Sequence, residues 1–254
     1  MSEISPSKEL IKLYAKQLRV PCFCDYENVI RQLSPEDGYD KFLIELMKQE
    51  LLGRADASQK RRIKVANFPV TKTLDEFDYT RLQHVSKAYI QELASCDFIK
   101  KRQNIVMIGN PGAGKTHLSI GLGMKACFSG FNVKFCTAVN LANELAEAAQ
   151  FHRMSKLEKS LAKIELLIID ELSYLTFNRY QSEMLFQVIS ERSERASVII
   201  TTNLEFSAWT ELFEKEIMVA ALIDRVTFRS HILNMNVKDS YRLEQALKAG
   251  KPNQ

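Results

Sequence analysis

The residues best suited to chemistry lie between Gly109 and Thr116, which follow the pattern G-x-x-x-x-G-K-T of a phosphate-binding loop. Glycines in such a loop allow a tight turn that points successive backbone N–H groups at one centre. Lys115 is expected to reach the β- and γ-phosphates, and the Thr116 hydroxyl to ligate Mg²⁺. An apolar run before the loop and a helical pattern after it provide the strand–loop–helix context that the motif requires. The sequence therefore predicts a nucleoside triphosphate site, whose contacts we expect from Gly109, Asn110, Pro111, Gly112, Ala113, Gly114, Lys115, Thr116, His117 and Asp170.

Two adjacent carboxylates form a second motif, because Asp170 and Glu171 end the apolar run 164–169. Ligands of open parallel sheets bind at the carboxyl ends of the strands, where this pair is expected to lie. Asp170 is predicted to hold Mg²⁺ together with Thr116, and Glu171 to polarise the attacking water as a general base. A strand's worth of sequence lies between the two motifs, so one strand is expected to separate them in the sheet. Small-molecule kinases and GTPases usually lack such a glutamate, so the pair favours ATP hydrolysis that drives conformational work.

Three further side chains are candidates for catalysis. Asn203 ends the apolar run 198–202, where its amide could orient the attacking water; the alternative is a cap of the next turn. Arg225 could enter a neighbouring subunit's site, and Arg242 could touch the γ-phosphate within its own subunit. The alternative for each arginine is a surface ion pair with the nearby Asp224 or Asp239.

The elements that position these residues alternate between strand and helix patterns from residue 104 onward. The expected strands are 104–108, 132–136, 166–170, 197–202 and 231–235, and their alternation with helices predicts an α/β fold with a parallel sheet between helices. Residues 1–67 instead read as a small all-helical module, with helices over 5–19 and 26–33 and a third that begins with Ser34 as its N-cap. The sequence around Pro69 has no helical period, so 68–254 is expected to form the ATPase domain. Phe77, near its start, could stack on an adenine base or simply anchor the core.

Composition limits the function classes. With 46% hydrophobic and 26% charged residues and a net charge of +4, the 254-residue chain reads as a soluble globular protein whose partners must be inferred from local clusters. The five cysteines are scattered and no His cluster completes a metal-ligand pattern, which favours reduced thiols. The chain has no signal-like start and no long apolar run, so we expect a cytoplasmic protein without a membrane partner.

The segments 109–118, 169–175 and 201–204 together resemble the IstB-type transposition helper ATPases, AAA+ proteins related to replicative helicase loaders of the DnaC/DnaI type. By this resemblance Asn203 matches the sensor-1 residue, Arg225 the arginine finger and Arg242 the sensor-2 arginine. The family implies an ATP- and Mg²⁺-dependent, DNA-binding homo-oligomer that assembles on duplex target DNA and recruits or activates a partner transposase. Asn110 and Ala113 occupy positions where Pro and Thr are commoner, and neither position is expected to supply a required side chain.

Two basic clusters are candidates for contact with DNA phosphates. The segment 54–64 holds five positive charges against one negative, and the segment 152–159 precedes the strand that ends in Asp170. A solvated helix face or a flexible joint is the alternative for the first cluster. The expected DNA contacts are Lys60, Arg61, Arg62 and Lys64 in the first cluster, and Arg153, Lys156 and Lys159 in the second.

The resemblance leaves competing functions open. A replicative helicase loader would use the same ATP chemistry with a different partner and would prefer single-stranded DNA. A DNA-architectural protein would bind ATP only to stabilise its structure. A metabolic kinase would need a pocket for a phosphoryl acceptor, for which the sequence gives no indication.

Overall fold

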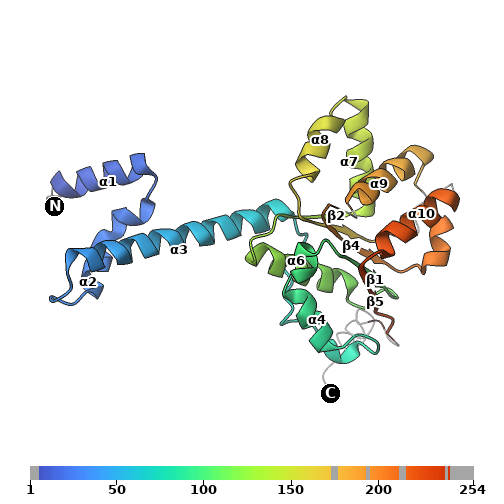
Figure 1. Ribbon diagram of the computed structural model, residues 1–254, viewed down its shortest axis with the longest axis horizontal. Helices are drawn as coiled ribbons and strands as arrows, with labels where there is room; N and C mark the ends of the chain where they lie inside the picture. The colour runs from blue at the N-terminus through green and yellow to red at the C-terminus, as the bar shows by residue number, and fades with distance from the viewer. Residues whose placement is uncertain (1–5, 173–176, 193–194, 212–215, 238–239, 241–254) are drawn as a thin grey trace, which may run out of the picture. The chain divides into compact units, whose positions relative to one another are not determined.

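The chain divides into two compact units, residues 1–61 and 62–254, in a computed structural model (Figure 1). The structure describes residues 6–172, 177–192, 195–211, 216–237 and 240. Among these residues no helix combines the length and the apolar character that crossing a membrane requires. The predicted domain boundary at residue 67 lies near this division, and the assignment of separate roles to the two parts stays a prediction.

The first unit is helical, as its sequence pattern indicates. Its elements are α1 (Pro6–Leu18), η1 (Pro21–Asp25), α2 (Tyr26–Gln32) and the long α3 (Tyr39–Ala66), which continues into the second unit. The prediction that Ser34 caps the third helix is wrong, because α3 begins five residues later. The backbone N–H of Ser34 instead donates to the Asp37 carboxylate at 2.8 Å, which closes a turn before the helix starts.

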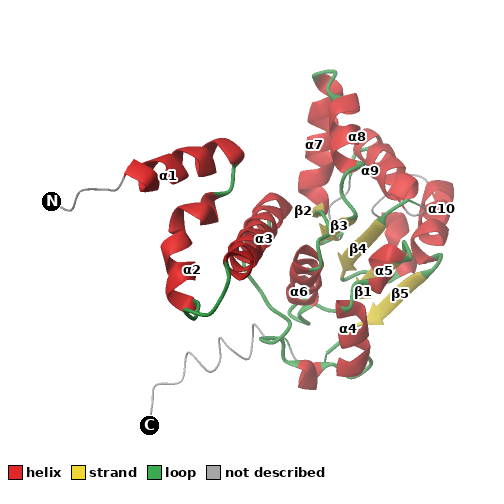
Figure 2. Cartoon of the chain, turned by 60° about the vertical axis from the view of Figure 1, so that its left-hand side comes forward, coloured by secondary structure: helices red, strands yellow, loops and turns green. Residues whose placement is uncertain are grey.

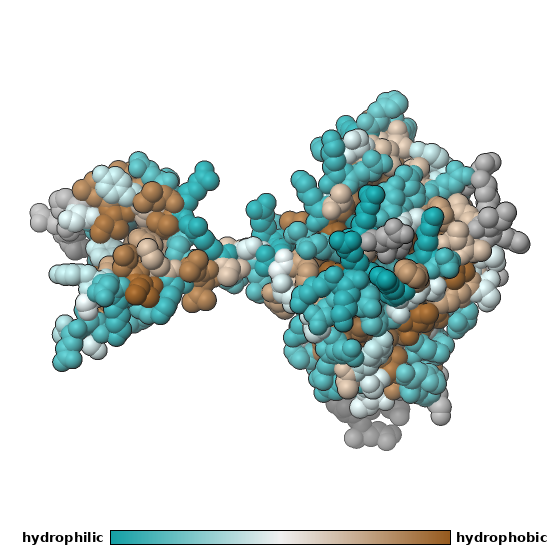
Figure 3. All heavy atoms as spheres, in the orientation of Figure 1, coloured by the Kyte–Doolittle hydropathy of each residue, from teal (hydrophilic) through white to brown (hydrophobic). Residues whose placement is uncertain are grey.

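Many large apolar side chains of the first unit remain exposed, and brown surface is visible on this unit in Figure 3. Only a few of its apolar residues are buried, such as Val29 and Leu46. Contiguous exposed apolar surface is uncommon on a protein that acts alone. The exposed apolar residues include Leu10, Leu13, Leu18, Ile30, Leu43, Ile44, Met47, Leu51 and Leu52.

A five-stranded parallel sheet organises the second unit. Its strands are β1 (Asn104–Ile108), β2 (Val133–Thr137), β3 (Leu166–Asp170), β4 (Ser197–Thr202) and β5 (Ser230–Asn234), in the order β2-β3-β4-β1-β5. The predicted α/β class and its five strands are thereby confirmed. One strand does separate β1 from β3, and it is β4, which comes later in the chain than either motif. Polar residues at the end of β4 therefore lie between the phosphate loop and the acidic pair.

Helices cover both faces of this sheet (Figure 2). Alternate β1 side chains point to opposite faces: Ile105 and Met107 pack in one core cluster, and Val106 and Ile108 in the other. The first face carries α4 (Lys87–Ala94), α5 (Asp97–Lys100) and α6 (Lys115–Phe128). The other face carries α7 (Ala138–Gln150), α8 (Met154–Leu161), α9 (Arg179–Arg192), the 3₁₀ helix η3 (Phe206–Glu211) and α10 (Glu216–Thr227). A further 3₁₀ turn, η2 (Tyr79–Arg81), precedes α4.

Candidate active site

The loop between β1 and α6 has the backbone that its glycines predict. Gly112 and Gly114 have φ angles of +80° and +91°, in the left-handed region that other residues rarely adopt. Helix α6 begins at Lys115, so its first N–H groups and the positive end of its dipole face the loop. The Lys115 ammonium donates hydrogen bonds to the carbonyl oxygens of Gly109 and Asn110, the latter at 3.0 Å. The loop thus has the shape and charge that a phosphate group requires.

Asp170 lies at the centre of the site, and two threonines donate to its carboxylate. Thr201 Oγ1 lies 2.5 Å from Asp170 Oδ1, and Thr116 Oγ1 lies 3.0 Å from Oδ2. The side chain is buried, with 3% of its surface exposed. Burial raises the pKa of Asp170, and the hydrogen bonds from Thr201 and Thr116 oppose that shift. A buried carboxylate that is held mainly by hydroxyl groups would gain free energy from a nearby cation.

The oxygen atoms around Asp170 fit a magnesium ion. Mg²⁺ prefers hard oxygen ligands and is usually held by one or two protein groups together with phosphate oxygens and water. Thr116 and Asp170 supply one hydroxyl and one carboxylate that already converge on each other. Their donor chemistry and the burial of the carboxylate are consistent with the predicted metal role of both residues.

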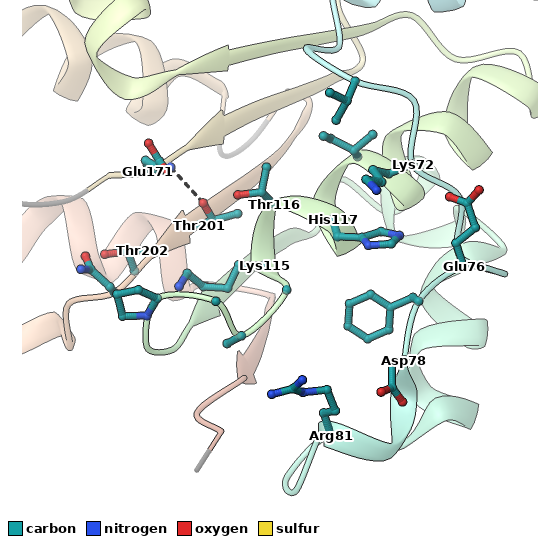
Figure 4. A pocket seen from close by; sticks show the side chains of 18 of the residues that line it. Lys72, Glu76, Asp78, Arg81, Lys115, Thr116, His117, Glu171, Thr201 and Thr202 are labelled. Carbon is teal, nitrogen blue, oxygen red and sulfur yellow. Dashed lines mark hydrogen bonds between the residues drawn. The ribbon is translucent and has the colours of Figure 1, made fainter. Parts of the chain in front are cut away.

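Glu171 follows Asp170 in a left-handed backbone conformation, with φ of 58°. Its backbone N–H donates to Thr201 Oγ1 at 2.9 Å, and its exposed side chain lines the same cavity as the loop (Figure 4). A non-glycine residue in this region carries strain that surrounding contacts must offset, a condition often found at functional sites. Thr201 thereby fixes both members of the acidic pair. Sequence reasoning did not single out Thr201, although a polar residue at the end of an apolar strand was a usable signal.

Asn203 follows β4 and lines the cavity. Its side-chain oxygen Oδ1 is buried and has no hydrogen-bond partner among the described residues. The next turn is held instead by Thr202, whose Oγ1 accepts the Leu204 N–H at 3.0 Å. An unpartnered buried amide oxygen is unfavourable unless a ligand or a water molecule pairs with it, so its position favours the water-orienting role over the capping role.

A cavity of about 610 Å³, a size typical of small-ligand sites, is lined by Thr116, Glu171, Thr201 and Asn203 together with residues 111–115 of the loop. Gly109, Asn110 and Asp170 are not part of its described lining. Figure 4 shows Glu171, Thr201 and Thr202 on one side of it, and Lys72, Glu76, Asp78 and Arg81 on the opposite side. The latter four come from the segment before α4, and sequence reasoning did not select them. Phe77 packs in the core cluster, with 8% exposed, as expected of a core anchor, and it also lines the cavity. Its stacking on an adenine base stays a prediction. A Cβ added at Gly114 would lie 2.8 Å from its ring.

Of the two arginine candidates, the structure describes only Arg225. Arg225, in the last turn of α10, is exposed and lies outside the described lining of the cavity. Its guanidinium carbon is 5.3 Å from the centre of the Phe186 ring. Arg242 lies outside the described residues. An exposed Arg225 away from its own subunit's cavity is compatible with action on a neighbouring subunit.

The predicted DNA-contacting residues lie on two helices. In α3, Lys60 is exposed and pairs with Asp56 at 2.8 Å, whereas Arg62 donates from Nε to the Cys127 carbonyl at 3.0 Å. That hydrogen bond connects the end of α3 to the end of α6 and gives Arg62 a structural role. Arg61 and Lys64 are also exposed, as are Arg153, Lys156 and Lys159 in and before α8. All these contacts with DNA remain predictions.

Known proteins are similar to this chain in sequence and in fold. Residues 14–249 match the sequence profile of the family described as IstB-like ATP binding protein. An ATP-binding protein of insertion sequence IS21 from Pseudomonas aeruginosa is 35% identical over 225 residues, which cover 88% of this chain and 84% of that protein. A counterpart from insertion sequence IS5376 of Geobacillus stearothermophilus is 35% identical over 240 residues, which cover 94% of this chain and 95% of that protein.

Solved structures are similar to this chain in fold. The DnaC helicase loader superposes with a TM-score of 0.55 at 20% identity, covering 65% of this chain and 96% of that one. AMPPCP-bound DnaA from Aquifex aeolicus also gives a TM-score of 0.55, at 17% identity over 72% of this chain and 56% of that one. The sheet and its helices therefore form an AAA+ domain. The chain belongs to the IstB-like ATP-binding protein family and has an AAA+ fold.

Proposed function

We propose that this ATPase assembles on target duplex DNA in its ATP-bound state and there recruits or activates the transposase of its insertion sequence. The proposal is carried by the hydrogen bonds from Thr116 and Thr201 to Asp170, and by Glu171 and Asn203, which line the same cavity as the phosphate loop. We infer hydrolysis rather than passive nucleotide storage, because Glu171, the proposed general base, and Asn203, the proposed water-orienting amide, line the same cavity as the phosphate loop.

In the proposed mechanism each side chain has one task. The backbone N–H groups of the loop bind phosphate oxygens, and Lys115 leaves the loop carbonyls to contact the β- and γ-phosphates. Thr116 and Asp170 would hold Mg²⁺, which supplies neutralisation of the charge that develops on the phosphates. Glu171 accepts a proton from the attacking water, and Asn203 orients that water through its free Oδ1.

Oligomerisation follows from the position of Arg225. A guanidinium group stabilises the charge of a transferring phosphoryl group only when it contacts the γ-phosphate. Since Arg225 is exposed and lies outside the described lining of its own cavity, we infer that it completes the site of a neighbouring subunit. ATP would then connect two subunits, and its hydrolysis would weaken their interface. Arg242 is proposed to contact the γ-phosphate within its own subunit.

The helical first unit is proposed to bind DNA or the partner protein. Its exposed apolar side chains on α1 and α3 supply surface that a protein partner could bury. The exposed basic residues Lys60, Arg61 and Lys64 supply charge for DNA phosphates near the end of α3. The transposase is the partner that the insertion-sequence relatives favour.

A Glu171→Gln variant tests this function directly. With ATP and duplex DNA, the variant is expected to bind nucleotide normally, to hydrolyse it at least about a hundredfold more slowly, and to accumulate as ordered multimers on DNA. Electron microscopy and sedimentation would detect these multimers, and Glu191→Gln, on the exposed surface of α9, is the matched control. A Glu171→Gln protein that stays monomeric with ATP and duplex DNA would contradict the proposal. Wild-type behaviour of the variant would instead support a passive, architectural use of ATP.

A replicative helicase loader is the second candidate, favoured by the likeness of the fold to the DnaC helicase loader. The two functions differ in substrate and partner. A loader should prefer single-stranded DNA and capture a hexameric helicase, whereas the proposed transposition ATPase should prefer duplex DNA and capture a transposase. Competition between duplex and single-stranded oligonucleotides of equal length, with ATP present, distinguishes them.

A further inference from the structure

His117 lines the cavity, as expected of a nucleotide contact, and it also makes a contact that its sequence position did not predict. It lies in the first turn of α6, directly after Lys115 and Thr116. In Figure 4 its ring lies on the side of the cavity that Lys72 occupies. Lys115 and Thr116 lie toward Glu171, on the other side. Neighbouring side chains of one helical turn are thus directed to opposite walls of the cavity.

A hydrogen bond joins His117 to the segment that forms the wall opposite Glu171, which we name the wall segment (residues 70–81). The distance between His117 Nε2 and the Thr73 carbonyl oxygen is 2.8 Å. A carbonyl oxygen only accepts, so Nε2 carries the hydrogen and donates it. The same ring meets the Phe77 ring edge to face, with centres 5.3 Å apart and an angle of 88° between the planes. His117 therefore contacts the wall segment at two points.

The wall segment lies along one stripe of α6. Gly114, His117 and Gly121 are three and four residues apart, so they share one side of the helix. The two glycines allow a close approach, because a Cβ at Gly114 would lie 2.8 Å from the Phe77 ring. A Cβ at Gly121 would lie 2.5 Å from Leu74 Cδ2. Of the three positions in the stripe, only His117 has a side chain that can donate a hydrogen bond.

The wall segment is also connected internally. The Tyr79 hydroxyl donates to the Leu74 carbonyl at 2.8 Å, and the Phe77 N–H donates to the same oxygen at 3.3 Å. The Phe77 and Tyr79 rings pack with their centres 5.1 Å apart. These contacts link the residue next to Thr73 to the part of the segment that lines the cavity. The attachment of Thr73 to His117 therefore helps to fix the position of that lining.

The wall segment lies where the nucleoside part of a bound nucleotide is expected. In the proposed mechanism the γ-phosphate lies beside Glu171, and the phosphate loop holds the phosphates that follow it. The ribose and the base must then extend away from Glu171. On that side the cavity is lined by residues of the wall segment, among them Lys72, Phe77 and Arg81.

We propose that His117 is a positioning residue that holds the wall segment against α6, and so sets the affinity for the nucleoside part of ATP rather than for its phosphates. The inference rests on the proposed placement of the γ-phosphate beside Glu171. In this role His117 donates to the protein and not to phosphate, so the loop N–H groups and Lys115 keep their function without it. The chemical step should also be unaffected, because Glu171 and Thr201 lie on the opposite side of the cavity.

The kinetics of His117 variants test this role. His117→Ala is expected to raise the KM for ATP about tenfold, the scale of one lost hydrogen bond, while kcat changes less than about twofold. Inorganic tripolyphosphate, used as a competitive inhibitor of ATP hydrolysis, should keep its Ki within about threefold, because it has no nucleoside. His84→Ala, which replaces an exposed histidine outside the described lining of the cavity, is the control and should behave as wild type.

Two amide variants separate the hydrogen bond from a general effect of losing the ring. His117→Gln should restore most of the affinity for ATP, because its longer side chain can place an amide donor near the position of Nε2. His117→Asn, which is one carbon shorter, should resemble His117→Ala. Equal behaviour of the two amide variants would show that the bond to Thr73 is not the cause, and would overturn the proposal.

Hydrogen exchange gives a readout that does not depend on catalysis. The Phe77 amide, which donates within the wall segment, should exchange faster in His117→Ala, while the amides that pair β1 with β4 keep wild-type protection. An equal rise of the KM for ATP and the Ki for tripolyphosphate would assign His117 to the phosphate loop. A fall in kcat at unchanged KM would assign it to the chemical step. Either result overturns the proposal, as does wild-type behaviour of His117→Ala.

Glu171→Gln, measured in the same assays, separates this inference from the placement on which it rests. If Glu171→Gln hydrolyses ATP at the wild-type rate, the placement of the γ-phosphate beside Glu171 fails, and the role of His117 fails with it. If Glu171→Gln is slow and His117→Ala departs from the expected pattern, only the role of His117 is wrong.

Discussion

The Thr201 hydroxyl donates to Asp170 at 2.5 Å and accepts the Glu171 N–H at 2.9 Å, so a single side chain on β4 connects both acidic residues at the end of β3. Neither bond survives if the hydroxyl is removed. The left-handed conformation of Glu171, with φ of 58°, would then lose a contact that helps to offset its strain. Thr201 therefore holds the backbone of Glu171, the proposed general base.

Replacing Thr201 by Val should lower kcat roughly ten- to thirtyfold while the KM for ATP changes little, because the loss affects Glu171 more than the phosphate loop. Thr201→Ser should restore most of the rate, since it keeps the hydroxyl. Steady-state hydrolysis assays measure both parameters. Ser197→Ala is the matched control, because Ser197 Oγ, at the start of β4, donates to the Phe98 carbonyl and not to the acidic pair. An equal loss in both variants would indicate a general defect of β4.

Lys115→Ala should abolish nucleotide binding rather than hydrolysis alone. The ammonium group is held close to the loop by the Gly109 and Asn110 carbonyls, so the wild-type protein needs only a short movement to reach phosphate. We expect ATP affinity to fall at least about a hundredfold, which would remove the rise in Tm that saturating ATP gives the wild type. Lys125→Ala, farther along the same helix α6, serves as the control and should keep that rise. Unchanged ATP stabilisation of Lys115→Ala would exclude the phosphate-binding role.

Asp170→Asn should stabilise the nucleotide-free protein while it abolishes Mg²⁺-dependent hydrolysis. Burial raises the pKa of Asp170 in the folded protein above its pKa in the unfolded chain. At every pH above the pKa in the folded protein, the ionised carboxylate therefore destabilises the folded state relative to the unfolded state. That penalty disappears below the unfolded pKa, where the group is protonated in both states. At neutral pH the variant should therefore melt at a higher temperature than the wild type.

The pH dependence of this difference provides the check on Asp170. The advantage of Asp170→Asn should shrink as the pH falls through the folded pKa and vanish below the unfolded pKa, because wild-type Asp170 is then neutral. Thermal melts of both proteins across this range, without nucleotide or Mg²⁺, measure the difference. An advantage that stays constant with pH would assign the effect to packing and not to the buried charge.

The sequence predicted the sheet well because its signals are local. Five apolar runs marked the five strands, and the glycine pattern marked the loop whose positive φ angles the structure contains. The position of β4 between β1 and β3 could not be predicted from the sequence. The order of strands in a sheet depends on how the helices pack on both of its faces, which no local pattern specifies. For the same reason Thr201 was missed: its importance arises only from its neighbours across strands.

The contacts of Asn110 and of Ser34 were also beyond sequence reasoning, for two different reasons. Asn110 pairs with Val237, more than a hundred residues later, and no local pattern signals such a contact. Ser34 had a correct local pattern with Asp37, but that pattern closes a turn as readily as it caps a helix. The cavity wall formed by the segment before α4 likewise depends on tertiary packing, so no local pattern assigned Asp78 and Arg81 to the site.

Arg225→Ala should separate nucleotide binding from assembly-dependent hydrolysis. The side chain is exposed and stacks near Phe186, so its loss should leave the fold and ATP affinity intact. Hydrolysis in the presence of DNA should fall about a hundredfold, the scale of losing an arginine contact to a transferring phosphoryl group. Arg229→Ala, close in sequence and also exposed, is the control and should retain activity. Mixing Arg225→Ala with Glu171→Gln subunits should recover some hydrolysis, because some interfaces would then combine an intact arginine with an intact glutamate; no recovery would contradict action between subunits.

The salt dependence of DNA binding should identify which basic cluster contacts phosphates. Each phosphate contact on duplex DNA contributes about 0.9 to the slope of log affinity against log salt concentration. Replacing Arg153, Lys156 and Lys159 by Gln should therefore reduce that slope by roughly two to three if α8 lies on DNA. The same measurement on Lys60, Arg61 and Lys64 tests the end of α3, and Arg62 is left unchanged because its Nε holds the Cys127 carbonyl. A cluster whose neutralisation leaves the slope unchanged does not contact DNA, and an unchanged slope for both would place the DNA on a different surface.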